Sequence, residues 1–188
     1  MRHTFAVYVE DLPGVLNRVA SLFRRRAFNI ESLTVGYTET AGVSRMTIVV
    51  DTDEHGARRL EANLYKLVNV LRVDDITLRP SVERDLAMIK VSATPETRTH
   101  IMQLVDVFRA RVIDVAPDSV IIETTGTEDK IDGLVEVLKQ YGVIEMVRTG
   151  CVAMARGPRL GGLGDVAERA SGSGDETSTD DSNVSYSV

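Results

Sequence analysis

The chain has 188 residues, a length suited to one or two small domains. It is 43% hydrophobic and 27% charged, as expected of a soluble globular protein, and it holds no apolar run long enough to span a membrane. The net charge of -6 comes mostly from residues 161–188, so the remainder is nearly neutral and gives no support to nucleic-acid binding.

Cysteine usage and the N-terminal residues bear on the cellular compartment. Cys151 is the only cysteine, so the chain cannot form an internal disulfide. No long apolar segment follows Arg2 and His3, and hence no signal peptide is visible. We therefore expect a cytoplasmic protein without a membrane segment.

The first unit, residues 1–79, is predicted to fold in the order β-α-β-β-α-β. Its strands are expected over residues 4–9, 29–38, 46–50 and 70–78, and apolar side chains alternate in the first and third of these. Its two helices are marked by apolar residues at helical spacing, with Asp53 as a plausible cap of the second. The two stripes are Val15, Leu16, Val19, Leu22 and Phe23, then Ala57, Leu60, Leu64 and Leu67.

The second unit, residues 80–157, repeats this order. Thr94 and Pro95 are predicted to start its first helix, Thr127 to cap its second, and residues 143–155 to form its last strand. Two βαββαβ units predict an α+β protein of two tandem ferredoxin-like sandwiches, each with two helices on one face of an antiparallel sheet. Residues 158–188 are rich in Gly, Ser, Thr and Asp, and we expect a disordered acidic tail.

The segment between the first strand and the first helix carries the strongest functional signal. It reads Asp11-Leu12-Pro13-Gly14-Val15-Leu16, an acidic turn that leads through Pro-Gly into a helix. The first N–H groups of a helix have no intrahelical partner, and the helix dipole favours an anion there. A free amino acid fits this chemistry, because its carboxylate can bind the N–H groups and its ammonium can meet Asp11.

Two other interpretations of this turn stay open at this point. Asp11 can be an ordinary N-cap, with Pro13 at the first helical position. A small acylphosphatase-like hydrolase on the same fold would need an arginine and a polar side chain near the turn, for which Arg18 and Asn29 are available. Arg18 lies one turn beyond Gly14, which favours the solvated face of the helix.

The remaining chemical candidates are weak. His3, His55 and His100 lack the spacing of metal ligands and are expected at the surface. Cys151 lies in an apolar strand and is expected to be a buried, inert thiol. No phosphate-binding loop and no nucleophile–base pair is visible, so the chain is interpreted as a binding protein and not a catalyst.

An ordered set of motifs over about residues 1–157 resembles the small, regulatory subunit of acetolactate synthase. The set opens with Asp11-x-Pro13-Gly14-x-Leu16-x-Arg18-Val19. It continues with residues 28–35 (FNIESLTV), 44–48 (SRMTI), 64–73 (LYKLVNVLRV), Glu83-Arg84 and Ile113-Asp114-Val115.

The resemblance implies a chain without catalytic activity of its own. The first unit would be an ACT domain, which pairs side by side with that of a second copy and binds valine at the interface. The second unit would be an ACT-like domain that also dimerises. The partner would be the catalytic (large) subunit, which the chain activates and makes sensitive to valine in branched-chain amino acid biosynthesis. Thiamine diphosphate, Mg and FAD would be held by that partner, with no cofactor or metal in this chain.

The resemblance also assigns the effector site residue by residue. It implies binding by Asp11, Pro13, Gly14, Val15, Leu16, Asn29 and Ile30. The amide of Asn29 can donate and accept at once, and Val15, Leu16 and Ile30 would form apolar walls. Asp11 departs from the family, which often has asparagine there. An amino-acid-sensing module of another enzyme stays open as an alternative.

Overall fold

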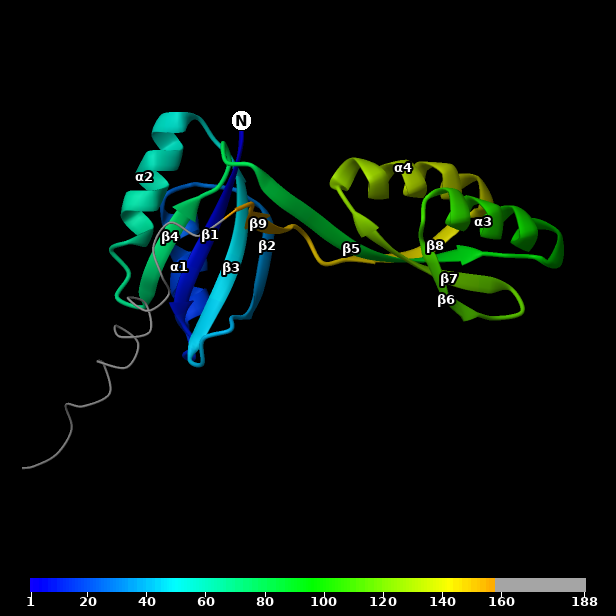
Figure 1. Cartoon of the computed structure of the whole chain (residues 1–188), viewed down its shortest axis with the longest axis horizontal. Helices are drawn as coiled ribbons and strands as arrows, with labels where there is room; N and C mark the ends of the chain where they lie inside the picture. The colour runs from blue at the N-terminus through cyan, green and yellow to red at the C-terminus, as the bar shows by residue number, and fades with distance from the viewer. Residues whose placement is uncertain (158–188) are drawn as a thin grey trace, which may run out of the picture.

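The first unit forms a sheet with two helices on one face, in the computed structural model that describes residues 1–157 (Figure 1). The strand order is β2-β3-β1-β4, with every pairing antiparallel. The elements are β1 (Arg2–Glu10), α1 (Val15–Arg25), β2 (Ile30–Tyr37), β3 (Val43–Asp51), α2 (Glu54–Leu64) and β4 (Val70–Asp75). This is the predicted order, although β4 ends earlier than expected.

The second unit repeats this arrangement, with strand order β6-β7-β5-β8. Its elements are β5 (Ser81–Ser92), α3 (Pro95–Val107), β6 (Arg111–Val115), β7 (Ser119–Gly126), α4 (Glu128–Leu138), the 3-10 turn η1 (Lys139–Tyr141), β8 (Val143–Arg148) and β9 (Val152–Ala155). The predicted α+β fold of two tandem ferredoxin-like sandwiches is confirmed. Residues 158–188, predicted to be a disordered tail, lie outside the described part of the chain.

Each unit has its own hydrophobic core between the sheet and its helices. In the first, Phe5 and Ile48 of the central strands pack against Phe23 of α1 and Leu60 of α2, all within 1% exposure. The second core is built in the same way from β5, β7, α3 and α4. The apolar periodicity of the sequence therefore reports the buried face of each element.

Local hydrogen bonds fix where the helices begin. The Asp53 carboxylate caps α2 by accepting from the Gly56 N–H at 2.6 Å, as predicted. Thr94 and Thr97 form a reciprocal capping box at the start of α3. Thr127 is the N-cap of α4, but its side chain makes no capping hydrogen bond.

The predicted last strand is wrong in one respect, because it divides into β8 and β9 around Gly150. β8 pairs with the second half of β5 in the second unit, whereas β9 pairs with residues 81–84 at the start of β5. Gly150 has φ +86, a left-handed conformation that breaks the strand. β5 and β9 therefore run as a two-stranded ribbon toward the first unit (Figure 1).

None of the helices found in residues 1–157 is long and apolar enough to cross a membrane.

Candidate functional site

The turn between β1 and α1 is built around Gly14. Gly14 has φ +85 and is the N-cap of α1, which begins at Val15. The interpretation of Asp11 as N-cap and Pro13 as first helical residue is therefore wrong, because both precede the cap. A Cβ added at Gly14 would meet nothing within 4 Å, so the backbone lies open to an approaching ligand.

The start of α1 presents backbone donors that the fold leaves unused. The Val15 N–H donates to the Leu12 carbonyl at 3.3 Å, and the first bond into the helix runs from the Arg18 N–H to the Gly14 carbonyl at 3.0 Å. Among the described residues the N–H groups of Leu16 and Asn17 have no acceptor, and α1 has no acidic residue in its first turn. The helix dipole adds positive potential at this point, so a carboxylate is the group that fits.

Asp11 lies at the edge of this turn and is held by β3. Its N–H donates to the Gly42 carbonyl at 2.9 Å, and its carboxylate accepts from the Ser44 hydroxyl at 3.1 Å. Asp11 is exposed, so the carboxylate retains acceptor capacity for an ammonium group.

A polar network that the sequence did not predict supports the turn from behind. Asn69, in the loop before β4, donates through its side chain to the carboxylate of Glu10 and accepts from the guanidinium of Arg18. Glu10 and Asn69 are each 9% exposed. Arg18 is exposed as predicted, but it is anchored to Asn69. The one signal in the sequence was a single polar residue between Val68 and Val70.

The apolar residues of the predicted site do not all face the same way. The side chain of Val15 is 4% exposed and belongs to the core, so its expected role as a ligand wall is wrong and only its backbone lies at the turn. Leu12 and Leu16 are 54% and 44% exposed. They give the open turn an apolar rim.

Asn29 and Ile30 lie far from the turn within one chain. Ile30 opens β2 and pairs with Val50, which itself pairs with His3 near the start of β1. The turn follows the other end of β1, level with Tyr37. Seven residue steps of β2 separate the two ends, roughly 23 Å at the usual strand rise. The structure brings together Asp11, Pro13, Gly14, Val15 and Leu16, and leaves Asn29 and Ile30 at the opposite end of the sheet.

This separation also bears on the hydrolase alternative. Arg18 is bound to Asn69, and Asn29 lies at the far end of β2. The two residues suggested for that chemistry do not meet in one chain.

The other titratable candidates have structural roles. His3 is 4% exposed, so its expected surface position is wrong: β1 begins at Arg2, and His3 stacks on Phe5 inside the sandwich with its Nδ1 3.3 Å from an Asp75 oxygen. Cys151 is 8% exposed, as predicted, and burial raises the pKa of its thiol to about 11. Within residues 1–157 no group of three His, Cys, Asp or Glu side chains is placed to hold a metal ion.

Comparison with known proteins identifies the family. Residues 84–157 match the family model described as the small subunit of acetolactate synthase, and residues 5–72 match the one described as the AHAS small subunit-like ACT domain. The probable acetolactate synthase small subunit of Archaeoglobus fulgidus is 54% identical over 157 residues, which cover 84% of this chain and 98% of that protein. The acetolactate synthase small subunit of Bacillus subtilis is 48% identical over 158 residues, 84% of this chain and 92% of that protein.

A solved structure agrees with the sequence relatives. The crystal structure of the acetolactate synthase small subunit from Thermotoga maritima superposes with a TM-score of 0.79 at 42% identity, covering 85% of this chain and 99% of that one. Family models, relatives and fold converge on one assignment: the chain belongs to the acetolactate synthase small subunit family.

Proposed function

We propose that the chain is a non-catalytic regulatory subunit that binds the catalytic subunit of acetolactate synthase in the cytoplasm, activates it, and makes it sensitive to valine. Membership of the small subunit family supports the pairing with a catalytic subunit. On this proposal thiamine diphosphate, Mg and FAD are held by that partner, and this chain contributes amino-acid sensing and contact surface.

One observation carries the sensing role: the two halves of the predicted site lie level with opposite ends of β2, which is an edge strand. If two copies pair antiparallel along β2, about a two-fold axis near Leu33, the start of one β2 meets the end of the other. Asn29 and Ile30 of one copy then lie beside the turn at Gly14 of the second. A homodimer would assemble two complete sites from four half-sites.

The surface near this edge supports the pairing. Val35 and Tyr37 of β2 are 47% and 87% exposed, and Leu12 and Leu16 are exposed at the turn that follows β1. An edge strand with exposed backbone groups and apolar side chains is a surface suited to a second sheet. Dimerisation would cover both features.

The chemistry of the combined site suits a branched-chain amino acid. The free N–H groups of Leu16 and Asn17 would bind the carboxylate, and Asp11 would accept from the ammonium. The amide of Asn29 from the second copy would add a donor and an acceptor. Leu16 and Ile30 would contact the branched side chain, which glycine lacks.

Isothermal titration of the purified chain with valine, leucine, isoleucine and glycine tests the sensing role. We expect saturable valine binding in the micromolar-to-millimolar range, about -4 to -8 kcal/mol, and no response to glycine. Reconstitution with a catalytic subunit should then give higher activity, and valine should lower it. Absence of valine binding would overturn the sensing role, and absence of activation would overturn the regulatory role.

A further inference from the structure

Beyond Asn29 and Ile30, β2 carries several of the contacts between the first unit and the second domain. Glu31 forms an ion pair with the Arg2 Nε at 3.0 Å, and Arg2 pairs in turn with Glu128 at the start of α4. Ser32 and Thr34 then contact Cys151, where the chain passes from β8 to β9. The strand predicted to hold the effector is therefore also one of the strands that touch the second domain, together with β1 and β3.

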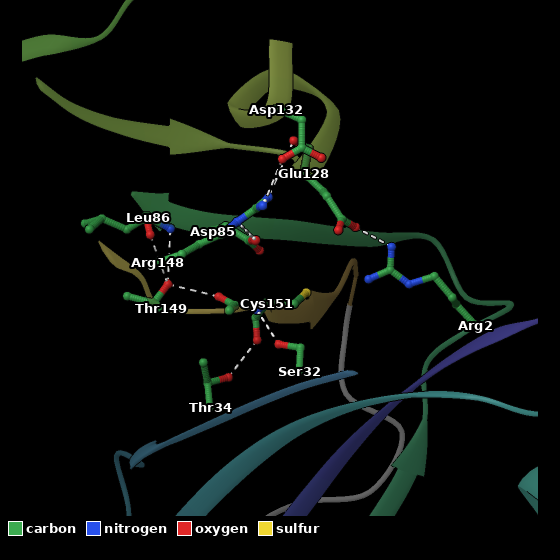
Figure 2. Close-up of polar contacts among 11 residues, drawn as sticks. Arg2, Ser32, Thr34, Asp85, Leu86, Glu128, Asp132, Arg148, Thr149 and Cys151 are labelled. Carbon is green, nitrogen blue, oxygen red and sulfur yellow. Dashed lines mark hydrogen bonds and ion pairs between the residues drawn. The ribbon is translucent and has the colours of Figure 1, made fainter. Parts of the chain in front are cut away.

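The contact at Cys151 engages both of its backbone groups. The Cys151 N–H donates to the Ser32 Oγ at 2.8 Å, and the Thr34 hydroxyl donates to the Cys151 carbonyl at 2.6 Å. Figure 2 shows both hydroxyls directed at this one residue from the neighbouring strand. Ser32 and Thr34, which we call the hydroxyl clamp, thus satisfy both backbone groups of Cys151 with their side chains.

Two further features make this contact specific. A Cβ at Gly150 would lie 2.6 Å from the Ser32 Oγ, so a side chain at this position would displace the hydroxyl from its contact. Next to it, Cys151 and Ala153 pack with Val49 and Ile76 of the first unit in a small buried cluster. β9, which continues the second domain in sequence, is therefore fastened to the first domain.

Apart from this small cluster, the junction between the two domains is open. A cavity of about 790 Å³ lies between them, lined by Arg2 and Ser32 on one side and by Asp85, Arg148 and Cys151 on the other. Across it the domains meet through polar contacts (Figure 2). The second domain is placed by the clamp, the Arg2–Glu128 ion pair, the hydrogen bond from Arg45 to the Ala153 carbonyl, the small apolar cluster and the ribbon of β5 and β9.

We propose that Ser32 and Thr34 are positioning residues that couple effector binding to the placement of the second domain. This inference rests on the proposed valine site. An effector held by Asn29 and Ile30 changes the position of β2, and the clamp carries that change to Cys151 and the ribbon. Coupling requires contacts that differ between the free and bound states. The clamp lies on β2, the same strand that begins with Ile30 of the proposed site.

A distance measurement in the full chain tests this coupling. Spin labels are placed at Arg59→Cys on α2 and Gln103→Cys on α3, two exposed positions, while the native Cys151 is buried and escapes labelling. Labelled protein is diluted into unlabelled protein, so that only distances within one chain are read. Saturating valine should shift the distance distribution, and in Ser32→Ala/Thr34→Val that shift should be lost.

Valine titration of the same proteins separates the outcomes. The double variant should bind valine as wild type does, and Thr34→Ser, which keeps the hydroxyl, should retain the shift. If the double variant fails to fold, the single variant Thr34→Val replaces it in the distance measurement. This inference alone is overturned if the distance shift persists in the double variant. It is also overturned if wild type binds valine without any distance shift. Failure of wild type to bind valine overturns the proposed site and the inference with it.

Discussion

Glu10 and Asn69 exchange two hydrogen bonds behind the β1–α1 turn. The Glu10 N–H donates to the Asn69 carbonyl at 3.0 Å, and the Asn69 side chain donates to the Glu10 carboxylate. Both residues are nearly buried, and Asn69 also anchors Arg18 from the first helix. One side chain thereby holds the end of β1, the start of α1 and the loop before β4 in one arrangement.

Replacing Asn69 should destabilise the first domain. Asn69→Ala removes a donor from a buried carboxylate and an acceptor from Arg18, which should lower the free energy of unfolding by about 1–3 kcal/mol. Urea denaturation followed by circular dichroism measures the change. Asn63→Ala is a matched control, because the Asn63 side chain donates to the carbonyl of Arg59 in its own helix and its backbone bonds are unchanged by alanine. That change should stay within about 0.5 kcal/mol, and an equal loss in both variants would contradict the role of Asn69.

Gly150 should tolerate alanine less well than another glycine of similar backbone conformation. Gly150→Ala combines a left-handed φ of +86 with a clash against the Ser32 hydroxyl. At Gly42, with φ +76, a Cβ meets nothing within 4 Å, so alanine there should cost only the conformational strain, about 1–2 kcal/mol. Thermal unfolding should give the larger loss for Gly150→Ala.

A double-mutant cycle isolates the clash at Gly150. In a Ser32→Ala background the added methyl group no longer meets the hydroxyl, so Gly150→Ala should cost less than it does in wild type. If the cost is the same in both backgrounds, the close approach of Ser32 to Gly150 is not what requires glycine.

The elements of both domains follow from local patterns. The stripe Ile131, Leu134 and Leu138 is buried as its spacing predicts, and Asp53 caps the helix that it precedes. The division of the last strand was not predicted, because apolar residues flank Arg148, Thr149 and Gly150 on both sides and the segment reads as one strand. Which partner β8 and β9 choose depends on β5, which is distant in the chain. Pairing between distant segments has no signature in the periodicity of either one.

The candidate site likewise has parts that a local pattern predicts and parts that depend on distant segments. The turn at Gly14 is contiguous in sequence, so its open backbone and helix start could be predicted. His3 was assigned wrongly because β1 begins two residues earlier than predicted, which puts His3 on the buried face with Phe5. The burial of Asn69 could not be predicted, because it depends on Glu10 and Arg18 from other elements. The meeting of Asn29 with the turn requires a second chain on our proposal, and a single sequence carries no pattern for that.

Cys151 should be unreactive in the folded protein and should make stability depend on pH. Burial, and secondarily Glu83, raises the pKa of its thiol from 9.0 to about 11. Between pH 9 and 11 the thiol therefore keeps its proton in the folded state but ionises in the unfolded state. The resulting stability is complete below pH 9 and is lost as the pH rises from 9 toward 11.

Two measurements check this expectation. A thiol reagent at pH 8 should react slowly with native protein and rapidly in denaturant. The free energy of unfolding of wild type, minus that of Cys151→Ala, should decline between pH 9 and 11 and be flat below pH 9. A fast native reaction, or a difference that rises with pH, would show that the thiol is accessible and ionised.

Two defective variants should restore valine binding when they are combined. Gly14→Asp places a second carboxylate where that of the ligand must lie, and Asn29→Ala removes the amide at the other half-site. Each homodimer then has a defect in both sites and should give no valine heat. In a heterodimer of the two variants both defects fall in one site, so the other is intact. Titration should recover half of the wild-type stoichiometry.

A pair of variants on the same half-site provides the control. Leu16→Asp damages the turn as Gly14→Asp does, so their heterodimer has one damaged turn in each site and should not bind valine. If neither mixture binds, the site does not combine residues of two chains. If both mixtures bind, damage to the turn does not prevent binding, and the carboxylate is held elsewhere. Recovery in the first mixture and not in the second requires one half-site from each copy.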